Sequence, residues 1–175
     1  MGNRRITEIP VNDAESFGCL LGYVPMSSSG QPSESIPDAE FAFPGSLRDR
    51  LVAAILAGIK TSTTTLLDEY ERENESVPSP GQLSRVVDSD GHAVATIMVK
   101  SVDAVRLGDV GLEHAIAEGE GHTTVAEWRH DHEEFWHSDE YRAYRGDAQF
   151  TVTDDTLVCL ERFEVVSLAP ESQPE

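Results

Sequence analysis

The chain has 175 residues, of which 39% are hydrophobic, so it is long enough to form one domain around a sizeable core. Thirteen basic residues stand against thirty-two acidic ones, which gives a formal net charge of −19. A surface this acidic repels polyanions, so duplex DNA, long RNA and anionic membranes are disfavoured as partners.

The amino-terminal stretch, MGNRRITEIP, carries basic residues but lacks the apolar segment of a secretory signal. No apolar run in the sequence approaches the length of a membrane span. Cys19 and Cys159 are the only cysteines, and their spacing matches neither a metal site nor a redox motif. We therefore expect a cytoplasmic protein with no membrane association, no metal and no other cofactor.

Composition divides the chain into three segments. Residues 1–39 form an N-terminal extension that ends in a linker rich in Ser and Pro, MSSSGQPSESIPD over residues 26–38. Residues 40–168 hold the periodic patterns of a folded domain, and residues 169–175 are a polar tail. We expect the protein to act as a monomer or a homodimer.

The first predicted element of the domain is a helix. Leu47, Leu51 and Ile55 recur at helical spacing, and Ser46 is a suitable N-cap. Gly58 follows the last apolar residues of this pattern. Because glycine tolerates the left-handed conformation in which many helices end, the helix is expected to stop near Gly58.

A strand, a turn and a second strand are predicted next. The turn is Ser89–Gly91, and apolar residues alternate along Ala93–Val99 after it. A second helix is expected from Thr124 to about Arg142, because Thr124 and Glu127 have the spacing of a capping box.

The last predicted element is a closing strand over Thr156–Val166, which is rich in β-prone residues. Helices and strands are mixed without a regular βαβ alternation. This order indicates an α+β domain around a curved or barrel-like sheet.

A run of hydroxyl residues, GIKTSTTT, follows the first helix at residues 58–65 and contains Lys60, one of only two lysines. In a strand, Thr61, Thr63 and Thr65 would share one face and the lysine would take the other. A tight bend after Gly58 would nevertheless aim Lys60 and Thr63 into one cavity. The alternative is that Lys60 only neutralises the negative end of the helix dipole.

The segment EGEGH places Glu118 and Glu120 on a glycine-rich loop just before the second helix. A carboxylate beside Lys60 would act as a base or orient the amine, whereas the alternative is a solvated acidic loop. The histidines of the second helix do not match a zinc motif, because His132 and His137 are five residues apart rather than four. We interpret that helix as a solvated charged surface without a metal.

These pieces together resemble the ASCH domain family of the PUA-like superfamily. The family motif Gly-x-Lys-x-x-Thr-x-Arg is matched by Gly58, Lys60 and Thr63, with Thr65 where the family has arginine. The resemblance extends from about residue 40 to 166 and includes the EGEG loop before Trp128. It implies a PUA-like fold, a small curved β-barrel with flanking α-helices.

The resemblance implies two kinds of activity. Some family members are amidohydrolases that remove the acetyl group of N4-acetylcytidine with a lysine, a threonine and a glutamate. By motif these residues are Lys60, Thr63 and Glu120, with Glu118 as the rival carboxylate. Either a neutral lysine or a carboxylate would accept the threonine proton. A lysine at the pocket mouth would add little to packing, so Lys60→Ala is expected to leave the fold intact.

The alternative activity is that of a module that binds RNA or a modified base, including a ribonuclease variant. The expected ligand is a small nucleoside-like molecule or single-stranded RNA. Aromatic residues would stack on the bases in this case. The further residues expected to contact a ligand in the same cleft are Gly58, Thr61, Thr65, Glu118, Tyr70 and Trp128.

Overall fold

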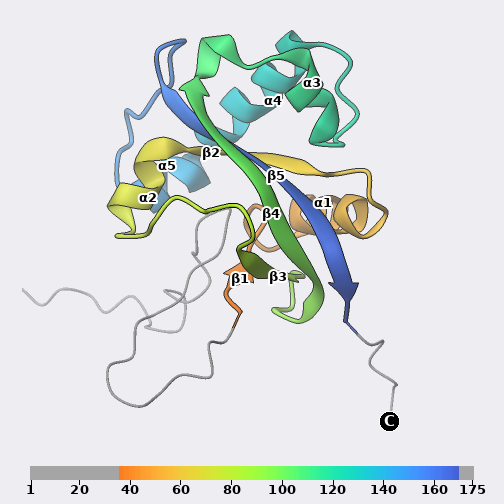
Figure 1. Cartoon of the computed structure of the whole chain (residues 1–175). Coiled ribbons are helices and arrows are strands. Elements are labelled where there is room, and N and C mark those ends of the chain that lie inside the picture. Colours follow the sequence, from red (N-terminus) through yellow and green to blue (C-terminus); the bar gives the residue numbers. More distant parts are fainter. Residues whose placement is uncertain (1–35, 170–175) are drawn as a thin grey trace, which may run out of the picture.

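A five-stranded sheet forms the centre of the computed structural model, which describes residues 36–169 (Figure 1). The strand order is β1-β3-β4-β5-β2, in which β1 and β3 are parallel and every other neighbouring pair is antiparallel. The strands are β1 (Asp38–Ala39), β2 (Ser62–Leu66), β3 (Leu83–Val87), β4 (Ala93–Arg106) and β5 (Leu157–Leu168).

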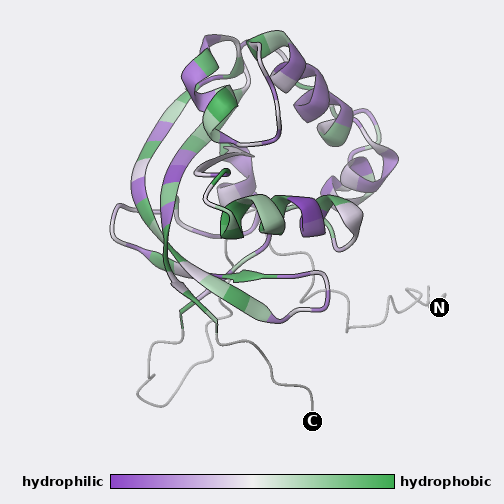
Figure 2. Cartoon of the chain, turned by 90° about the vertical axis from the view of Figure 1, so that its right-hand side faces the viewer, coloured by the Kyte–Doolittle hydropathy of each residue, from purple (hydrophilic) through white to green (hydrophobic). Residues whose placement is uncertain are grey.

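Most of the helices lie on one side of the sheet, and hydrophilic and hydrophobic residues are interspersed along them (Figure 2). Within residues 36–169, no helix combines the length and the apolar character that crossing a bilayer requires. The helices are α1 (Ser46–Leu56), α2 (Leu67–Arg72), α3 (Leu112–Ala117), α4 (Val125–Trp136) and α5 (Asp139–Arg145), with a 3-10 turn, η1 (Leu107–Asp109), before α3.

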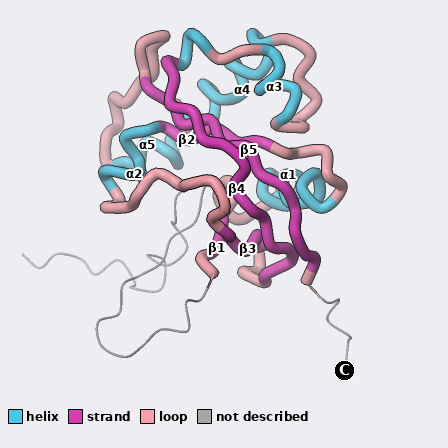
Figure 3. Tube along the Cα trace, viewed as in Figure 1, coloured by secondary structure: helices cyan, strands magenta, loops and turns pink. Residues whose placement is uncertain are grey.

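The sheet is mixed with helices in an α+β arrangement, as the sequence predicts, but it is not closed into a barrel. Among residues 36–169, the edge strand β1 pairs only with β3, and the other edge strand, β2, pairs only with β5. Because β1 is two residues long, it offers too few backbone groups to close the sheet. The central strands β4 and β5 run side by side over most of their length, and register shifts after Thr96 and Val99 let this pair bend (Figure 3).

The first helix ends where the sequence predicts, but it begins differently. Gly58 follows the C-cap Ala57 in a left-handed conformation with φ of 69°. Ser46 is the first residue of α1 rather than its N-cap, a position that Gly45 occupies without a side-chain hydrogen bond. The Ser89 hydroxyl instead accepts the backbone N–H of Gly45 at 2.9 Å, so a residue from the β3–β4 turn supports this end of the helix.

The predicted helix from Thr124 to Arg142 is two helices. Thr124 caps α4 with the expected capping box, in which its side chain accepts the N–H of Glu127. The helix stops after Trp136, because Ser138 leaves the helical conformation and its hydroxyl caps α5 by accepting the N–H of Tyr141 at 3.2 Å. This break turns the chain at one side of the pocket described below.

Two hydrophobic clusters form the core. One packs α1 on β3, β4 and β5, and the other packs α3, α4 and α5 on β2 and the upper parts of β4 and β5. Phe135 of α4 packs against both clusters, so the seam between them runs beside α4. The first cluster is Ala39, Phe41, Ala42, Leu51, Val52, Ile55, Val86, Ala95, Ile97 and Phe163. The second is Leu66, Leu107, Val110, Ala115, Trp128, Trp136, Tyr141, Val152 and Val158.

Glu161 of β5 should make folding stability depend on pH. It is 2% exposed, its Oε2 has no hydrogen-bond partner among residues 36–169, and burial raises its pKa from 4.5 to about 7. The folded state therefore holds a proton that the unfolded chain has lost, so stability falls as pH rises from about 4.5 to 7. Glu161→Gln should remove this fall and stabilise the protein at pH 8 by up to about 3 kcal/mol, with little effect near pH 4.

Denaturant unfolding of the variant and the unmodified protein at both pH values measures this difference. The exposed residue Glu164 of the same strand provides the control Glu164→Gln, which should show no such dependence. An equal effect of Glu161→Gln at pH 4 and pH 8 would contradict the prediction.

Candidate functional site

Lys60 reaches the protein interior because the chain turns sharply after α1. The left-handed conformation of Gly58 ends the helix. The backbone N–H groups of Ile59 and Lys60 then both bond to the carbonyl of Ala54, at 2.9 and 3.1 Å. This double anchor fixes the entry into β2, and Lys60 is only 2% exposed.

The loop after α3 is attached to the same turn. Thr61 donates its backbone N–H to the carbonyl of Ala117 at 2.8 Å, and its hydroxyl donates to the same oxygen at 3.3 Å. Gly119 approaches the backbone of Ile59 and Lys60 so closely that a Cβ there would lie 2.6 Å from backbone atoms. These contacts place the EGEG loop against Lys60.

The Lys60 ammonium lies between two carboxylates. Its Nζ is 3.2 Å from Glu118 Oε2 and 3.2 Å from Glu120 Oε1, and it also donates to the Glu118 carbonyl at 3.4 Å. Burial lowers the pKa of Lys60, but the negative charges of Glu118 and Glu120 outweigh burial and raise it. Lys60 is therefore charged.

The expectation that Lys60 sits at a pocket mouth and contributes little to the fold is wrong. The side chain is buried and forms ion pairs with two carboxylates. Removing one partner of a buried pair leaves the other charge unpaired, which costs about 3–5 kcal/mol. Loss of activity in Lys60→Ala would therefore mix a catalytic effect with a structural one.

Glu118 is buried, and both oxygens of its carboxylate are bonded to neighbouring residues. Its Oε1 accepts from the Thr64 hydroxyl at 2.6 Å and from the indole N–H of Trp128 at 3.0 Å. His114 Nε2 lies 3.0 Å from the same oxygen and 2.8 Å from the Thr64 hydroxyl. Burial raises the pKa of Glu118, but the charge of Lys60 and further positive partners outweigh burial and hold the pKa well below 4.5. Glu118 is thus a fixed anion.

His132 supports the same carboxylate from α4. Its Nδ1 lies 3.0 Å from the carbonyl of Trp128, and its ring stacks on that indole with centroids 4.3 Å apart. Nε2 lies 3.5 Å from Glu118 Oε2. Burial lowers the pKa of His132, but the negative charge of Glu118 outweighs burial and raises it. His132 is therefore a buried member of the site and not part of a solvated helix surface.

Glu120 differs from Glu118 in its exposure. Its side chain is 15% exposed, compared with 1% for Glu118. Within the part of the chain that the structure describes, its side-chain hydrogen bond is the one with Lys60. The Glu120 carboxylate is thus held at one point and remains open to the pocket.

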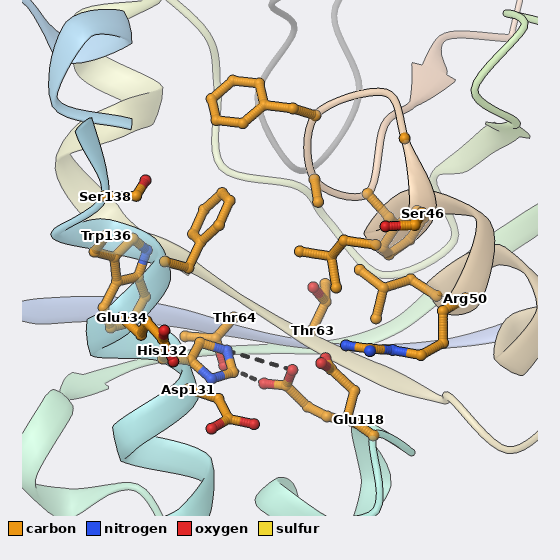
Figure 4. Close-up of a pocket in the computed structure, with 18 of the residues that line it drawn as sticks. Ser46, Arg50, Thr63, Thr64, Glu118, Asp131, His132, Glu134, Trp136 and Ser138 are labelled. Carbon is orange, nitrogen blue, oxygen red and sulfur yellow. Dashed lines mark hydrogen bonds and ion pairs between the residues drawn. The ribbon is translucent and has the colours of Figure 1, made fainter. Parts of the chain in front are cut away.

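A pocket of about 570 Å³ opens above these residues, between α1 and α4 (Figure 4). Figure 4 shows Thr63 and Glu118 between Arg50 on the α1 side and His132 and Trp136 on the α4 side. Apolar residues of both core clusters form part of the wall: Phe41, Ala42, Leu51, Phe135 and Trp136. The polar residues at its base are Lys60, Thr63, Thr64, Glu118, Glu120 and His132.

The structure brings some of the predicted site residues together and places others elsewhere. Lys60, Thr63, Glu118 and Glu120 all line the pocket. The other residues expected to contact a ligand are not among its lining residues: Gly58, Thr61, Thr65, Tyr70 and Trp128. Of these, Gly58 and Thr61 shape the turn that carries Lys60, and Trp128 is fully buried with its indole N–H on Glu118.

Three residues of the site were missed in the sequence: Thr64, His114 and His132. All three contact Glu118. The available signal was the spacing of His132, which lies four residues after Trp128 and so shares its helix face. His114 lies four residues before Glu118 at the end of α3, so its spacing was a local signal as well. Thr64 carries no such signal, because it meets Glu118 only through the packing of β2 on α3.

Among residues 36–169, metal-ligand side chains gather at two places, Asp88–Asp90–His92 and His130–Asp131–Glu134. The second group lies on α4, and two of its members, Asp131 and Glu134, line the pocket. Its three residues are exposed, as acidic surface groups commonly are without a metal. No metal is assigned to either group.

The sequence matches the ASCH domain family over residues 40–167. A crystal structure of a protein from Enterococcus faecalis V583, of family DUF984, is 30% identical and has a TM-score of 0.61, with 70% of each chain covered. An ASCH domain from Lactobacillus crispatus JV V101 is 28% identical with a TM-score of 0.59, covering 69% of this chain and 72% of that one. A comparison with curated proteins gave no match. These ASCH relatives indicate a PUA-like fold, and in this chain the sheet formed by the described residues is open.

Gly119→Ala should separate the EGEG loop from Lys60. Gly119 has φ of +69°, and an added Cβ would meet Ile59 and Lys60 backbone atoms at 2.6 Å. Gly146 has the same φ of +69°, but no atom lies within 4 Å of its Cβ position, so Gly146→Ala is a matched control for the conformational cost alone. We expect Gly119→Ala to lower the free energy of unfolding by about 1–3 kcal/mol more than the control. Equal losses in denaturant unfolding would contradict the close packing described here.

Proposed function

The chain belongs to the ASCH domain family, and on this premise we propose that its pocket hydrolyses the amide of an acylated pyrimidine nucleoside, of the N4-acetylcytidine type. The observation that carries the proposal is the buried Lys60 ammonium held between Glu118 and Glu120, in a pocket that Thr63 also lines. A fixed positive charge beside a hydroxyl and a carboxylate suits acyl transfer, in which an oxyanion develops.

The two carboxylates have different roles in this proposal. Glu118 is buried, its pKa is held well below 4.5, and its oxygens accept from Thr64, Trp128 and Lys60, so it positions the lysine. Glu120 is the more exposed carboxylate and is the general base. A neutral Lys60 as the base is disfavoured because its pKa is raised.

The reaction then proceeds in two acyl-transfer steps. Glu120 takes the proton of the Thr63 hydroxyl, whose oxygen attacks the acetyl carbon while Lys60 stabilises the oxyanion. The C–N bond breaks, and the amine leaves with the proton from Glu120. Water, deprotonated by Glu120, next cleaves the acetyl ester of Thr63, which releases acetate and returns a proton to the threonine.

The competing function is a module that binds RNA or a modified base, with or without ribonuclease activity. It relied on Tyr70 and Trp128 as stacking residues, which need an accessible ring face. Tyr70 is 2% exposed and Trp128 is fully buried, so this function has less support than hydrolysis of a small amide.

Conversion of N4-acetylcytidine to cytidine and acetate by the purified protein tests the proposal. Glu120→Gln should lower kcat by about 10²–10⁴-fold, the usual contribution of a general base, and Thr63→Val should abolish the acyl-enzyme route. The matched control is Glu164→Gln, because Glu164 pairs with the other lysine, Lys100, on the surface at 2.8 Å. This control should retain full activity.

Two outcomes would contradict the proposed reaction. One is the absence of any cytidine release by the unmodified protein across pH 6–9. The other is activity in Glu120→Gln equal to that of Glu164→Gln, since a carboxamide cannot accept the proton. Glu120 lies at the pocket and is partly exposed, so its replacement should leave the protein folded, which circular dichroism verifies.

A further inference from the structure

Arg50 lies on the α1 wall of the pocket. It is exposed to solvent and is one of the lining residues. Figure 4 shows its side chain extending from α1 toward Thr63 at the base of the pocket. A guanidinium therefore borders the same space as the reactive residues.

The Arg50 side chain forms no hydrogen bond or ion pair with any residue in the range 36–169. Every other arginine and lysine in that range bonds to a carboxylate or a backbone carbonyl. Arg48, two residues earlier on α1, shows the contrast, because it is buried and bonds to Glu40 and to the carbonyl of Ala42. Arg50 is thus the one unengaged cation of the described fold.

An arginine without an ion pair among residues 36–169 is unexpected in a chain with a net charge of −19, because acidic side chains are abundant. Glu118 and Glu120, at the base of the pocket, form ion pairs with Lys60. Asp131, on the opposite wall, lies 2.9 Å from His122 Nε2. A cation without an acidic partner keeps its full capacity for an anion. The planar guanidinium fork matches the oxygens of a phosphate, which it binds through two parallel hydrogen bonds.

We propose that the pocket takes a pyrimidine nucleoside monophosphate, with Arg50 binding the phosphate. This inference rests on the proposed function and names its substrate class, an acylated nucleotide rather than the free nucleoside. The cavity of about 570 Å³ lies within the usual range of roughly 300–1,000 Å³ for ligand pockets, so base, ribose and phosphate fit together. The acidic surface repels a long polyanion, whereas a single phosphate meets one local cation.

Calorimetric titration with cytidine 5′-monophosphate and with cytidine tests Arg50 without requiring hydrolysis. The unmodified protein should bind the monophosphate about ten- to a hundredfold more tightly, as expected for a hydrogen-bonded charge pair. Arg50→Gln should lose this preference and bind cytidine as before. Arg106→Gln is the control of equal charge change, because Arg106 is exposed and pairs with Asp109 outside the pocket. It should behave like the unmodified protein.

Equal binding of the two ligands by the unmodified protein, a preference retained in Arg50→Gln, or no binding of either at millimolar concentration would each overturn the inference. Single-stranded oligocytidylate distinguishes a mononucleotide from an RNA strand as the source of the phosphate. Tighter binding of the oligonucleotide, with affinity falling steeply as salt is added, would overturn the assignment to a mononucleotide.

The same titrations keep the two proposals separable. A preference for the monophosphate that depends on Arg50, without hydrolysis of N4-acetylcytidine or its 5′-phosphate, upholds the phosphate site and rejects the amidohydrolase. Hydrolysis without any preference for the phosphate upholds the amidohydrolase and rejects the role of Arg50.

Discussion

An ammonium that is shut away from water must be paired with negative charge, and this requirement organises the site around Lys60. Two carboxylates, Glu118 and Glu120, lie 3.2 Å from its Nζ. Glu118 is itself buried and needs donors of its own, which Thr64 supplies from β2 and Trp128 and His132 supply from α4. These contacts depend on one another, because the loss of any one of them would leave a polar or charged group unpaired inside the protein and destabilise the fold.

The position of this polar network follows from the two hydrophobic clusters. One cluster holds α1 on the sheet, and the other holds α3 and α4, so the segments that carry Lys60 and Glu118 come from opposite sides of the seam. Thr61 and Gly119 join them through backbone contacts. The pocket is therefore a place where apolar walls meet a charged base, an arrangement typical of small-molecule sites.

Local chemistry made part of this structure predictable. The left-handed Gly58, the capping box of Thr124 and the alternation along β4 depend on neighbours in sequence, and each is present. Long-range packing decided the rest. The burial of His132 depends on how α4 packs, and the open sheet depends on the shortness of β1, neither of which has a local pattern. Whether Arg50 has an ion-pair partner among residues 36–169 depends on how every other charged residue is paired. That pairing is known only from the folded structure.

The central claim is that Lys60 is a buried, charged lysine, and nuclear magnetic resonance of the lysine side chains tests it most directly. The chain has only two lysines, so Lys100, which is exposed, serves as an internal reference, and Lys100→Arg assigns the signals without disturbing the buried site. We expect the Lys60 signal to remain that of an ammonium as the pH rises above 10.5, the ordinary pKa of lysine, and to exchange slowly with solvent. Deprotonation of Lys60 near neutral pH would contradict it.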